Sequence, residues 1–188
     1  MREIPDDLVK MAARGDRTAF EEIYKLTSGY VFAVALRVCI FPETAEEVTQ
    51  DVFVKLHRDL WQFNFKSELK TWMYRITVNT AIDYYNREKK RRTREVADDS
   101  LIENHGVGSE LEKKIDKEAN EKAVKELLAA LNSDQRSCVV LREIEGLSYE
   151  EIAKVLKVKI NTVRTRLKRA REILVRTAQQ KKEAKDEL

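Results

Sequence analysis

The residues with the clearest chemical potential in this sequence lie near its C-terminal end, in the stretch KINTVRTRLKRAR from Lys159 to Arg171. Six of these thirteen residues are Lys or Arg, which attract phosphate, and apolar residues recur among them every three or four positions. That spacing predicts an amphipathic helix with one buried face. A solvated basic helix has the same pattern, so the interpretation depends on the residues around it.

A short helix and a turn are expected directly before this stretch. Ser148, followed three residues later by Glu151, has the pattern of a capping box and predicts the start of a helix. The small Ala153 on its apolar face would let a second helix cross closely. A turn over residues 157–159, with Asn161 as the next cap, completes a helix-turn-helix motif, whose second helix enters the major groove of DNA.

The turn and the second helix can be analysed residue by residue. Lys157 stands at a position where many such motifs have Gly, so a positive φ is expected there at a small cost. On a helical wheel, Val163, Leu167, Ala170 and Leu174 face inward. Arg can pair with guanine and Thr can contact a thymine methyl group, whereas cations at the sides suit phosphates. The candidate DNA contacts are Thr162, Arg164, Thr165, Arg166, Lys168, Arg169 and Arg171, with Arg166 and Arg171 at the sides.

A second group of residues lies in a long helix expected from about Glu68 to Arg92. One stripe of this helix combines an aromatic ring, a cation and amides, which suits the unstacked bases of a single strand. The basic residues from Lys89 to Arg92 suit duplex phosphates. Trp72 could equally be a core residue. The stripe consists of Trp72, Arg75, Asn79, Asp83 and Asn86.

The elements that must position these residues are predicted to be helices throughout. The 188 residues include only 5 Gly and 2 Pro, too few for the many turns of an all-β fold. We expect helices within residues 6–38, with Asp16 as the cap of one helix and a break between Leu26 and Val31. Pro42 predicts the first turn of another helix, which would bury Ala45, Val48, Val52 and Leu56.

Charge divides the chain into segments. Residues 148–182 carry a net charge of +8 and residues 95–118 a net charge of −5, which predicts a nucleic-acid-binding face preceded by an acidic linker. We therefore expect an all-α protein with two helical domains joined by a flexible linker. The predicted boundaries are 1–94 for the first domain, 95–118 for the linker, 119–182 for the second domain and 183–188 for a tail.

The remaining composition indicates no cofactor and no metal. Cys39 and Cys138 lie in apolar surroundings outside any CxxC motif, which predicts two buried, reduced thiols. His57 and His105 lack metal-ligand spacing. No apolar run approaches the roughly 18 residues of a membrane span, and no signal peptide opens the chain, so a cytoplasmic location is expected.

The segments TWMYRITVNTAIDYYNR and GLSYEEIAKVLKVKINTVRTRLKRARE resemble the extracytoplasmic-function (ECF) group of bacterial sigma factors, and PETAEEVTQDVFVKL resembles their region 2.2. The resemblance runs from Phe20 to about Leu174, except for the linker. It implies a region 2 that binds the coiled coil of the largest core RNA polymerase subunit and melts the −10 element. It also implies a region 4 that reads the −35 element and rests on the β flap. The resemblance further implies an anti-sigma partner. It implies no active site and no small-molecule substrate.

The same resemblance assigns roles to individual positions. Polymerase binding is implied for Glu47, Gln50, Asp51, Phe53 and Val54, of which Phe53 could instead be core. The loop that receives a flipped −10 base is implied for Asn64, Phe65, Lys66, Ser67 and Glu68. Strand melting is implied for Trp72, Arg75 and Asn79, and −35 reading for Arg164, Thr165, Lys168 and Arg169.

Departures from the family pattern leave the promoter sequence open. Lys157 and Asn161 stand where Gly is frequent, and Lys168 stands where an aromatic residue or His is frequent.

Two other classes of protein fit part of the pattern. A stand-alone repressor or activator would have the helix-turn-helix and would usually dimerise on two half-sites, but it would have no use for the Trp72, Arg75 and Asn79 stripe. A recombinase-like enzyme would need a catalytic cluster in the first domain. Glu46, Glu47 and Asp51 imitate one, but the sequence offers no companion nucleophile or ligand set.

Overall fold

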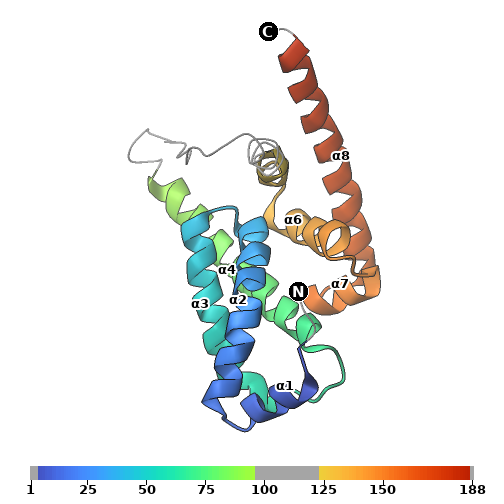
Figure 1. Ribbon diagram of the computed structural model, residues 1–188. Helices are drawn as coiled ribbons and strands as arrows, with labels where there is room; N and C mark the ends of the chain where they lie inside the picture. The colour runs from blue at the N-terminus through green and yellow to red at the C-terminus, as the bar shows by residue number, and fades with distance from the viewer. Residues whose placement is uncertain (1–3, 96–122, 187–188) are drawn as a thin grey trace.

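The computed structural model describes residues 4–95 and 123–186, and every regular element within these residues is a helix. Figure 1 shows a group of long helices lying side by side and a second group of helices against one flank of the first. We call residues 4–95 the N-terminal bundle and residues 123–186 the C-terminal bundle. The all-α fold with two sets of helices is confirmed. The predicted linker lies outside the described residues, apart from Glu95, which ends a helix.

The N-terminal bundle begins as predicted but contains fewer breaks. It consists of α1 (Asp6–Ala13), α2 (Arg17–Cys39), α3 (Pro42–Asp59), the short η1 (Leu60–Gln62) and α4 (Leu69–Glu95).

Asp16 caps α2 by accepting a hydrogen bond from the Ala19 amide at 3.0 Å. The expected break between Leu26 and Val31 is wrong. The Thr27 hydroxyl donates a hydrogen bond to the Ile23 carbonyl at 2.6 Å, within one continuous helix. Buried residues lie on both sides of Gly29, among them Ile23 and Val31, so the helix continues past this glycine.

Helix α3 has the buried face that the sequence predicts. Ala45, Val48 and Val52 are fully buried and Leu56 is 2% exposed, all in the core between α2, α3 and α4. Pro42 occupies the first turn, where its missing amide proton costs nothing. The opposite face of α3 is therefore left for solvent or a partner.

The C-terminal bundle contains a helix over residues 123–129, then α6 (Ser133–Val139), the π-helical turn η2 (Val140–Ile144), α7 (Tyr149–Leu156) and α8 (Ile160–Asp186). Within the described residues, none of the helices of either bundle has the length and apolar character that a membrane span requires.

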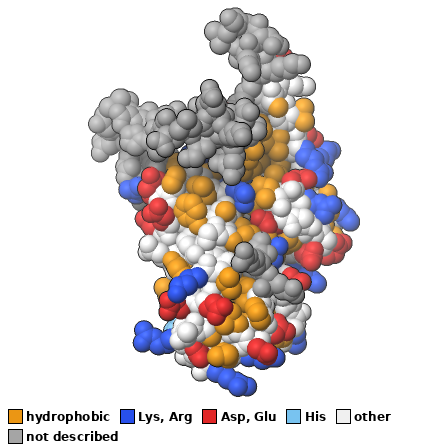
Figure 2. Space-filling view, in the orientation of Figure 1, with side chains coloured by type: hydrophobic (Ala, Val, Ile, Leu, Met, Phe, Trp, Pro, Cys, Tyr) orange, Lys and Arg blue, Asp and Glu red, His pale blue; other side chains and the backbone are white. Residues whose placement is uncertain are grey.

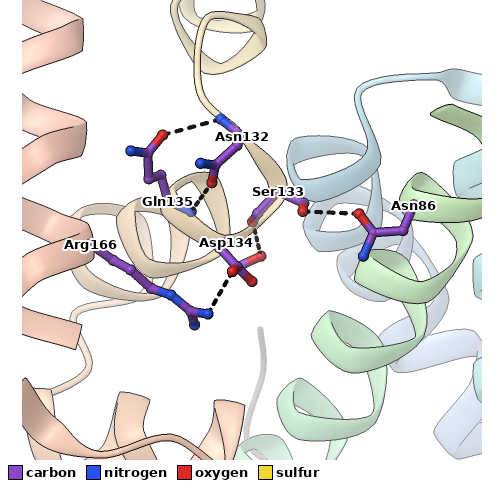
Figure 3. A network of polar contacts seen from close by, with 7 residues as sticks. Asn86, Asn132, Ser133, Asp134, Gln135 and Arg166 are labelled. Atoms are coloured by element: carbon purple, nitrogen blue, oxygen red, sulfur yellow. Dashed lines mark hydrogen bonds and ion pairs between the residues drawn. The ribbon is translucent and has the colours of Figure 1, made fainter. Parts of the chain in front are cut away.

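The helix starts in this bundle follow local capping. Asn132 and Gln135 form a reciprocal capping box, so α6 begins at Ser133 (Figure 3). Ser148 and Glu151 form the second capping box, as predicted. The predicted cap at Asn161 is wrong, because α8 already begins at Ile160 and the Asn161 side chain accepts a hydrogen bond from the Arg164 guanidinium at 3.1 Å.

Arg136 connects the two bundles from a position with no exposure to solvent. Its guanidinium donates to the carbonyls of Leu128 at 2.8 Å and Leu131 at 2.6 Å in its own bundle, and to the carbonyl of Val38 at 2.8 Å in α2. It also lies over the Tyr85 ring of α4, 4.5 Å from its centroid. Val38 belongs to the last turn of α2, where free carbonyls and the helix dipole favour a cation.

We expect Arg136→Met to lower the free energy of unfolding by about 3 kcal/mol or more. The substitution keeps an apolar stem but removes three hydrogen bonds to carbonyls, and each buried acceptor left unsatisfied typically costs about 1–3 kcal/mol. The Leu128 carbonyl keeps the Leu131 amide at 3.2 Å, so the Leu131 and Val38 carbonyls account for most of the expected loss. Urea titration followed by circular dichroism measures the change. Arg176→Met, at an exposed position of α8, is the control and should change stability by less than about 0.5 kcal/mol. Equal curves for both variants would contradict a structural role for Arg136.

Candidate nucleic-acid interface

Helix α8 presents a polar face over a buried apolar one. Val163 and Ala170 are fully buried, Leu167 is 1% exposed, and Leu174 is half-buried. The turn before α8 has Lys157 at φ 52°, the left-handed conformation that the sequence predicts. The outward residues are therefore held on one side of a packed helix. In Figure 2, Lys and Arg side chains lie along the right-hand edge of the molecule, over α7 and α8.

The four predicted −35 readers all lie exposed on this face: Arg164, Thr165, Lys168 and Arg169. Thr165 donates its hydroxyl proton to the Asn161 carbonyl at 2.9 Å, so its methyl group and oxygen lone pairs remain for a ligand. Thr162 is half-buried at the edge of the face. Their geometry suits a helix that inserts into a groove.

The two predicted phosphate contacts are held by carboxylates of the same bundle. Arg166 pairs with Asp134 of α6 at 2.5 Å, as Figure 3 shows, and Arg171 pairs with Glu143 of η2 at 2.9 Å. The Glu143 hydrogen bond raises the pKa of Arg171 above its usual value. The sequence does not reveal these acidic partners, because they come from elements 28 to 32 residues earlier in the chain.

The stripe on α4 is partly exposed. Arg75 lies in solvent, and Trp72 is half-buried, with its ring 5.5 Å from that of Phe63. Asn79 donates to the Arg75 carbonyl at 2.7 Å and to the Val155 carbonyl of α7 at 3.2 Å. Trp72 thus takes part in packing while staying partly accessible to solvent.

The loop before α4 displays its side chains to solvent. Residues 64–68 are all exposed, and Phe65 adopts a positive φ of 56°. The Phe65 ring lies 4.8 Å from Phe63, and the Lys10 ammonium lies 5.8 Å from its centroid. Asn64 accepts a hydrogen bond from the Lys66 amide at 3.2 Å, which shapes the turn. Trp61 of η1, which precedes this loop in the chain, is 71% exposed and was not among the predicted site residues.

The outer face of α3 contains four of the five residues assigned to polymerase binding. Glu47, Gln50 and Val54 are exposed, with Val54 at 65%. Asp51 pairs with Lys55 at 3.0 Å.

Phe53 instead lies in the core, 6% exposed and packed edge-on against Tyr24 at 4.6 Å between ring centroids.

The cysteines are buried free thiols in the described residues, as predicted. Burial raises the pKa of Cys39 and that of Cys138 to about 11 each. No group of three or more potential metal-ligating side chains occurs within residues 4–95 and 123–186.

Two family models match the chain. The model for sigma-70 region 2 matches residues 23–91, and that for sigma-70 region 4 matches residues 121–174, together more than half of the chain. The ECF RNA polymerase sigma-E factor of Haemophilus influenzae is 34% identical over 176 residues, covering 89% of this chain and 91% of the relative. The RNA polymerase sigma-H factor of Pseudomonas aeruginosa is 30% identical over 184 residues, covering 95% of both.

Solved structures match over both bundles. The chain is similar to CnrH in complex with the cytosolic domain of CnrY, with a TM-score of 0.63, 26% identity, and coverage of 92% of this chain and 95% of that one. It is also similar to the sigma factor RpoE of Bartonella quintana in complex with the anti-sigma factor NepR, with a TM-score of 0.61, 28% identity, and coverage of 82% and 93%. The chain belongs to the ECF group of RNA polymerase sigma factors.

Proposed function

We propose that this sigma factor binds core RNA polymerase and its promoter through three separate surfaces. The outer face of α3 binds core RNA polymerase, the α4 stripe with the loop before it binds the opened −10 element, and the outward face of α8 reads the −35 element. The observation that carries the proposal is the exposed row Arg164, Thr165, Lys168 and Arg169 over the buried face of α8, in one chain with an exposed aromatic and polar surface before α4.

Affinity and selectivity come from different residues of α8. Arg169 and Lys168 point away from the core and reach base edges, whereas Arg166 and Arg171 lie at the flanks and reach phosphates. The carboxylates that hold the two flanking arginines in the free chain do not prevent this. The Arg171–Glu143 pair is solvent-exposed, and such pairs contribute only about 0–1 kcal/mol, so a phosphate oxygen can replace Glu143. The Arg166–Asp134 pair is partly buried, with Arg166 23% exposed, and a phosphate oxygen would replace Asp134 as an equivalent charged acceptor.

The N-terminal bundle supplies the features that strand opening requires. The exposed Phe65 and Trp61 rings offer surfaces on which unpaired bases stack, and the polar side chains of the loop offer hydrogen bonds to a flipped base. Arg75 adds positive charge on the same side of α4. Bond formation is left to the polymerase, and this chain contributes binding energy alone.

Partners and location follow from the family. The Bartonella quintana relative is complexed with an anti-sigma factor, which supports control of this chain by an anti-sigma partner as well. The chain acts where the polymerase works, in the cytoplasm. We further propose that residues 1–94 and 119–182 are the two functional domains, joined by residues 95–118.

Gel filtration with core RNA polymerase, followed by run-off transcription from a genomic fragment library, tests the function. Co-elution and promoter-selective transcripts are expected, and the transcripts yield the −35 and −10 sequences. A chain that does not co-elute with a matched core enzyme would instead require examination as a dimeric stand-alone regulator.

Arg169→Ala should weaken promoter binding by about 1–3 kcal/mol and relax selectivity at one −35 position. The arginine lies on the exposed face of α8 and can donate two hydrogen bonds to one guanine. Transcription from a promoter set with single −35 substitutions measures both effects. The control is Arg176→Ala, two turns further along α8 and also exposed. A uniform loss on all promoters would assign Arg169 to phosphate contact only.

Asp51→Ala should weaken core-polymerase binding and leave the fold intact. Its ion pair with Lys55 is partly buried, with the two side chains 33% and 30% exposed, but Lys55 keeps a hydrogen bond to the Thr80 hydroxyl at 3.0 Å, so the loss of Asp51 should lower stability by about 1 kcal/mol. Affinity for core enzyme and thermal unfolding are measured in parallel. Glu21→Ala removes the matching i,i+4 pair with Lys25 on α2 and controls for the loss of a surface pair. If Asp51→Ala unfolds the chain, the residue is structural.

A further inference from the structure

The loop before α4 holds a bulky side chain in a backbone conformation that such residues rarely adopt. Phe65 has a φ of 56°, in the left-handed region, yet its ring is 40% exposed and gains little burial in return. The ring lies 4.8 Å from that of Phe63, which in turn lies 5.5 Å from the Trp72 ring on α4. A strained residue that presents its side chain to solvent indicates a binding function, because packing alone does not explain it.

The first helix of the chain places a cation over this exposed ring. The Lys10 ammonium of α1 lies 5.8 Å from the centroid of Phe65, and the Lys10 side chain is 51% exposed. Val9 and Ala12 bury the inner side of α1 in the core, and the helix packs against α2 and η1. Figure 1 shows α1 and the loop that leads into α4 at the same end of the N-terminal bundle. None of the residues that the proposed function assigns to the −10 element comes from α1.

An ammonium beside an exposed aromatic ring suits one class of ligand, an unpaired nucleotide. Single-stranded nucleic acid binds through bases that stack on aromatic rings and through phosphates that meet cations. Phe65 supplies the ring and Lys10 supplies the cation, from two elements far apart in the chain. Lys is depleted at the centres of protein–protein interfaces, which favours a nucleic acid over a protein as the partner of this surface.

One carboxylate contacts Lys10 in the free chain. Asp7, one turn earlier on α1, accepts a hydrogen bond from the Lys10 ammonium at 3.2 Å, and the Asp7 side chain is 91% exposed. An ion pair so open to solvent contributes little to stability, so a phosphate oxygen can take the place of the carboxylate. Asp7 therefore competes with such a ligand for the same cation.

We propose that Lys10 is a further nucleic-acid contact, which binds a phosphate of the opened −10 strand beside the base that stacks on Phe65. The −10 surface then extends from α4 across its preceding loop to α1. A phosphate contact carries no sequence information, so Lys10 adds affinity and leaves base selectivity to other residues. The role of Lys10 rests on the proposed role of the loop, and separate variants test the two.

Fluorescence anisotropy of the full chain with a short, labelled, mixed-sequence single strand of DNA tests the contact. Lys10→Gln should weaken binding several-fold at low salt. The slope of log affinity against log salt concentration should become shallower by about 0.7, the change expected for the loss of one phosphate contact on a single strand. Asp7→Asn should instead tighten binding, because it removes the competing carboxylate and leaves the ammonium in place. Thermal unfolding followed by circular dichroism should be unchanged in both variants, since the pair that they disrupt is exposed.

A second exposed ion pair provides controls with the same changes of charge. Lys25 and Glu21 pair at 2.6 Å on α2, a helix that contributes no residue to the proposed −10 surface, and their side chains are 69% and 62% exposed. Lys25→Gln and Glu21→Gln alter the net charge as the two α1 variants do. Both should change the affinity for the strand by less than about twofold and leave the salt slope unchanged, because charges remote from the bound strand are screened.

Two further variants, Phe65→Leu and Arg75→Gln, report on the loop and on α4 independently of α1. If both weaken binding while Lys10→Gln behaves like Lys25→Gln, Lys10 makes no phosphate contact and the proposed −10 surface stands without it. If none of the three weakens binding, the proposed −10 function of this surface fails, and the role of Lys10 fails with it. A Lys10→Gln variant that binds the strand normally but loses affinity for core RNA polymerase would overturn the proposal and assign Lys10 to a protein contact.

Discussion

The guanidinium of Arg136 fixes the position of the C-terminal bundle relative to the rest of the chain. A fully buried cation must find acceptors, and within the described residues it finds three carbonyls, contributed by Leu128, Leu131 and Val38. Those of Leu128 and Val38 are in last turns of helices, where carbonyls lack the usual i+4 donor, and the Leu128 carbonyl also accepts from the Leu131 amide at 3.2 Å. The interaction therefore satisfies two helix ends and one charge at once, and it places α6 directly against α2 and α4.

From that position, α6 acts as the middle layer of the molecule. Consecutive residues of its first turn point in different directions: Ser133 reaches Asn86 on α4, and Asp134 reaches Arg166 on α8 (Figure 3). The capping box of Asn132 and Gln135 starts the helix at the position from which both side chains can make these contacts. The orientation of α8, and so of its outward face, follows from a short helix of seven residues that is held at its middle residue by a buried charge.

Local patterns in the sequence were enough for most of the individual helices. The buried residues of α3, the Ser148 capping box and the positive φ of Lys157 all depend on neighbours within a few positions, and all were predicted correctly. The break expected in α2 failed because the buried stripe on both sides of Gly29 outweighs the weak helix propensity of one glycine.

Contacts between distant segments could not be predicted in this way. The acids that hold Arg166 and Arg171, and the partners of Arg136 and Glu145, come from other elements. From a single sequence, an arginine or a glutamate is predicted to be exposed, because charged side chains usually lie on the surface. Only the tertiary structure reveals that Arg136 has no exposure and that Glu145 is buried by tyrosines 71 and 115 residues away.

The contact between the bundles combines apolar packing with directed polar pairs. Buried apolar residues of both bundles belong to one hydrophobic cluster, and such burial has no preferred direction. Hydrogen bonds do have a preferred direction, so the polar pairs fix how the two bundles are placed against each other. Asn79 is an example, because its amide donates to the Arg75 carbonyl within α4 at 2.7 Å and to the Val155 carbonyl of α7 at 3.2 Å. One side chain is thereby positioned on its own helix and joined to the other bundle.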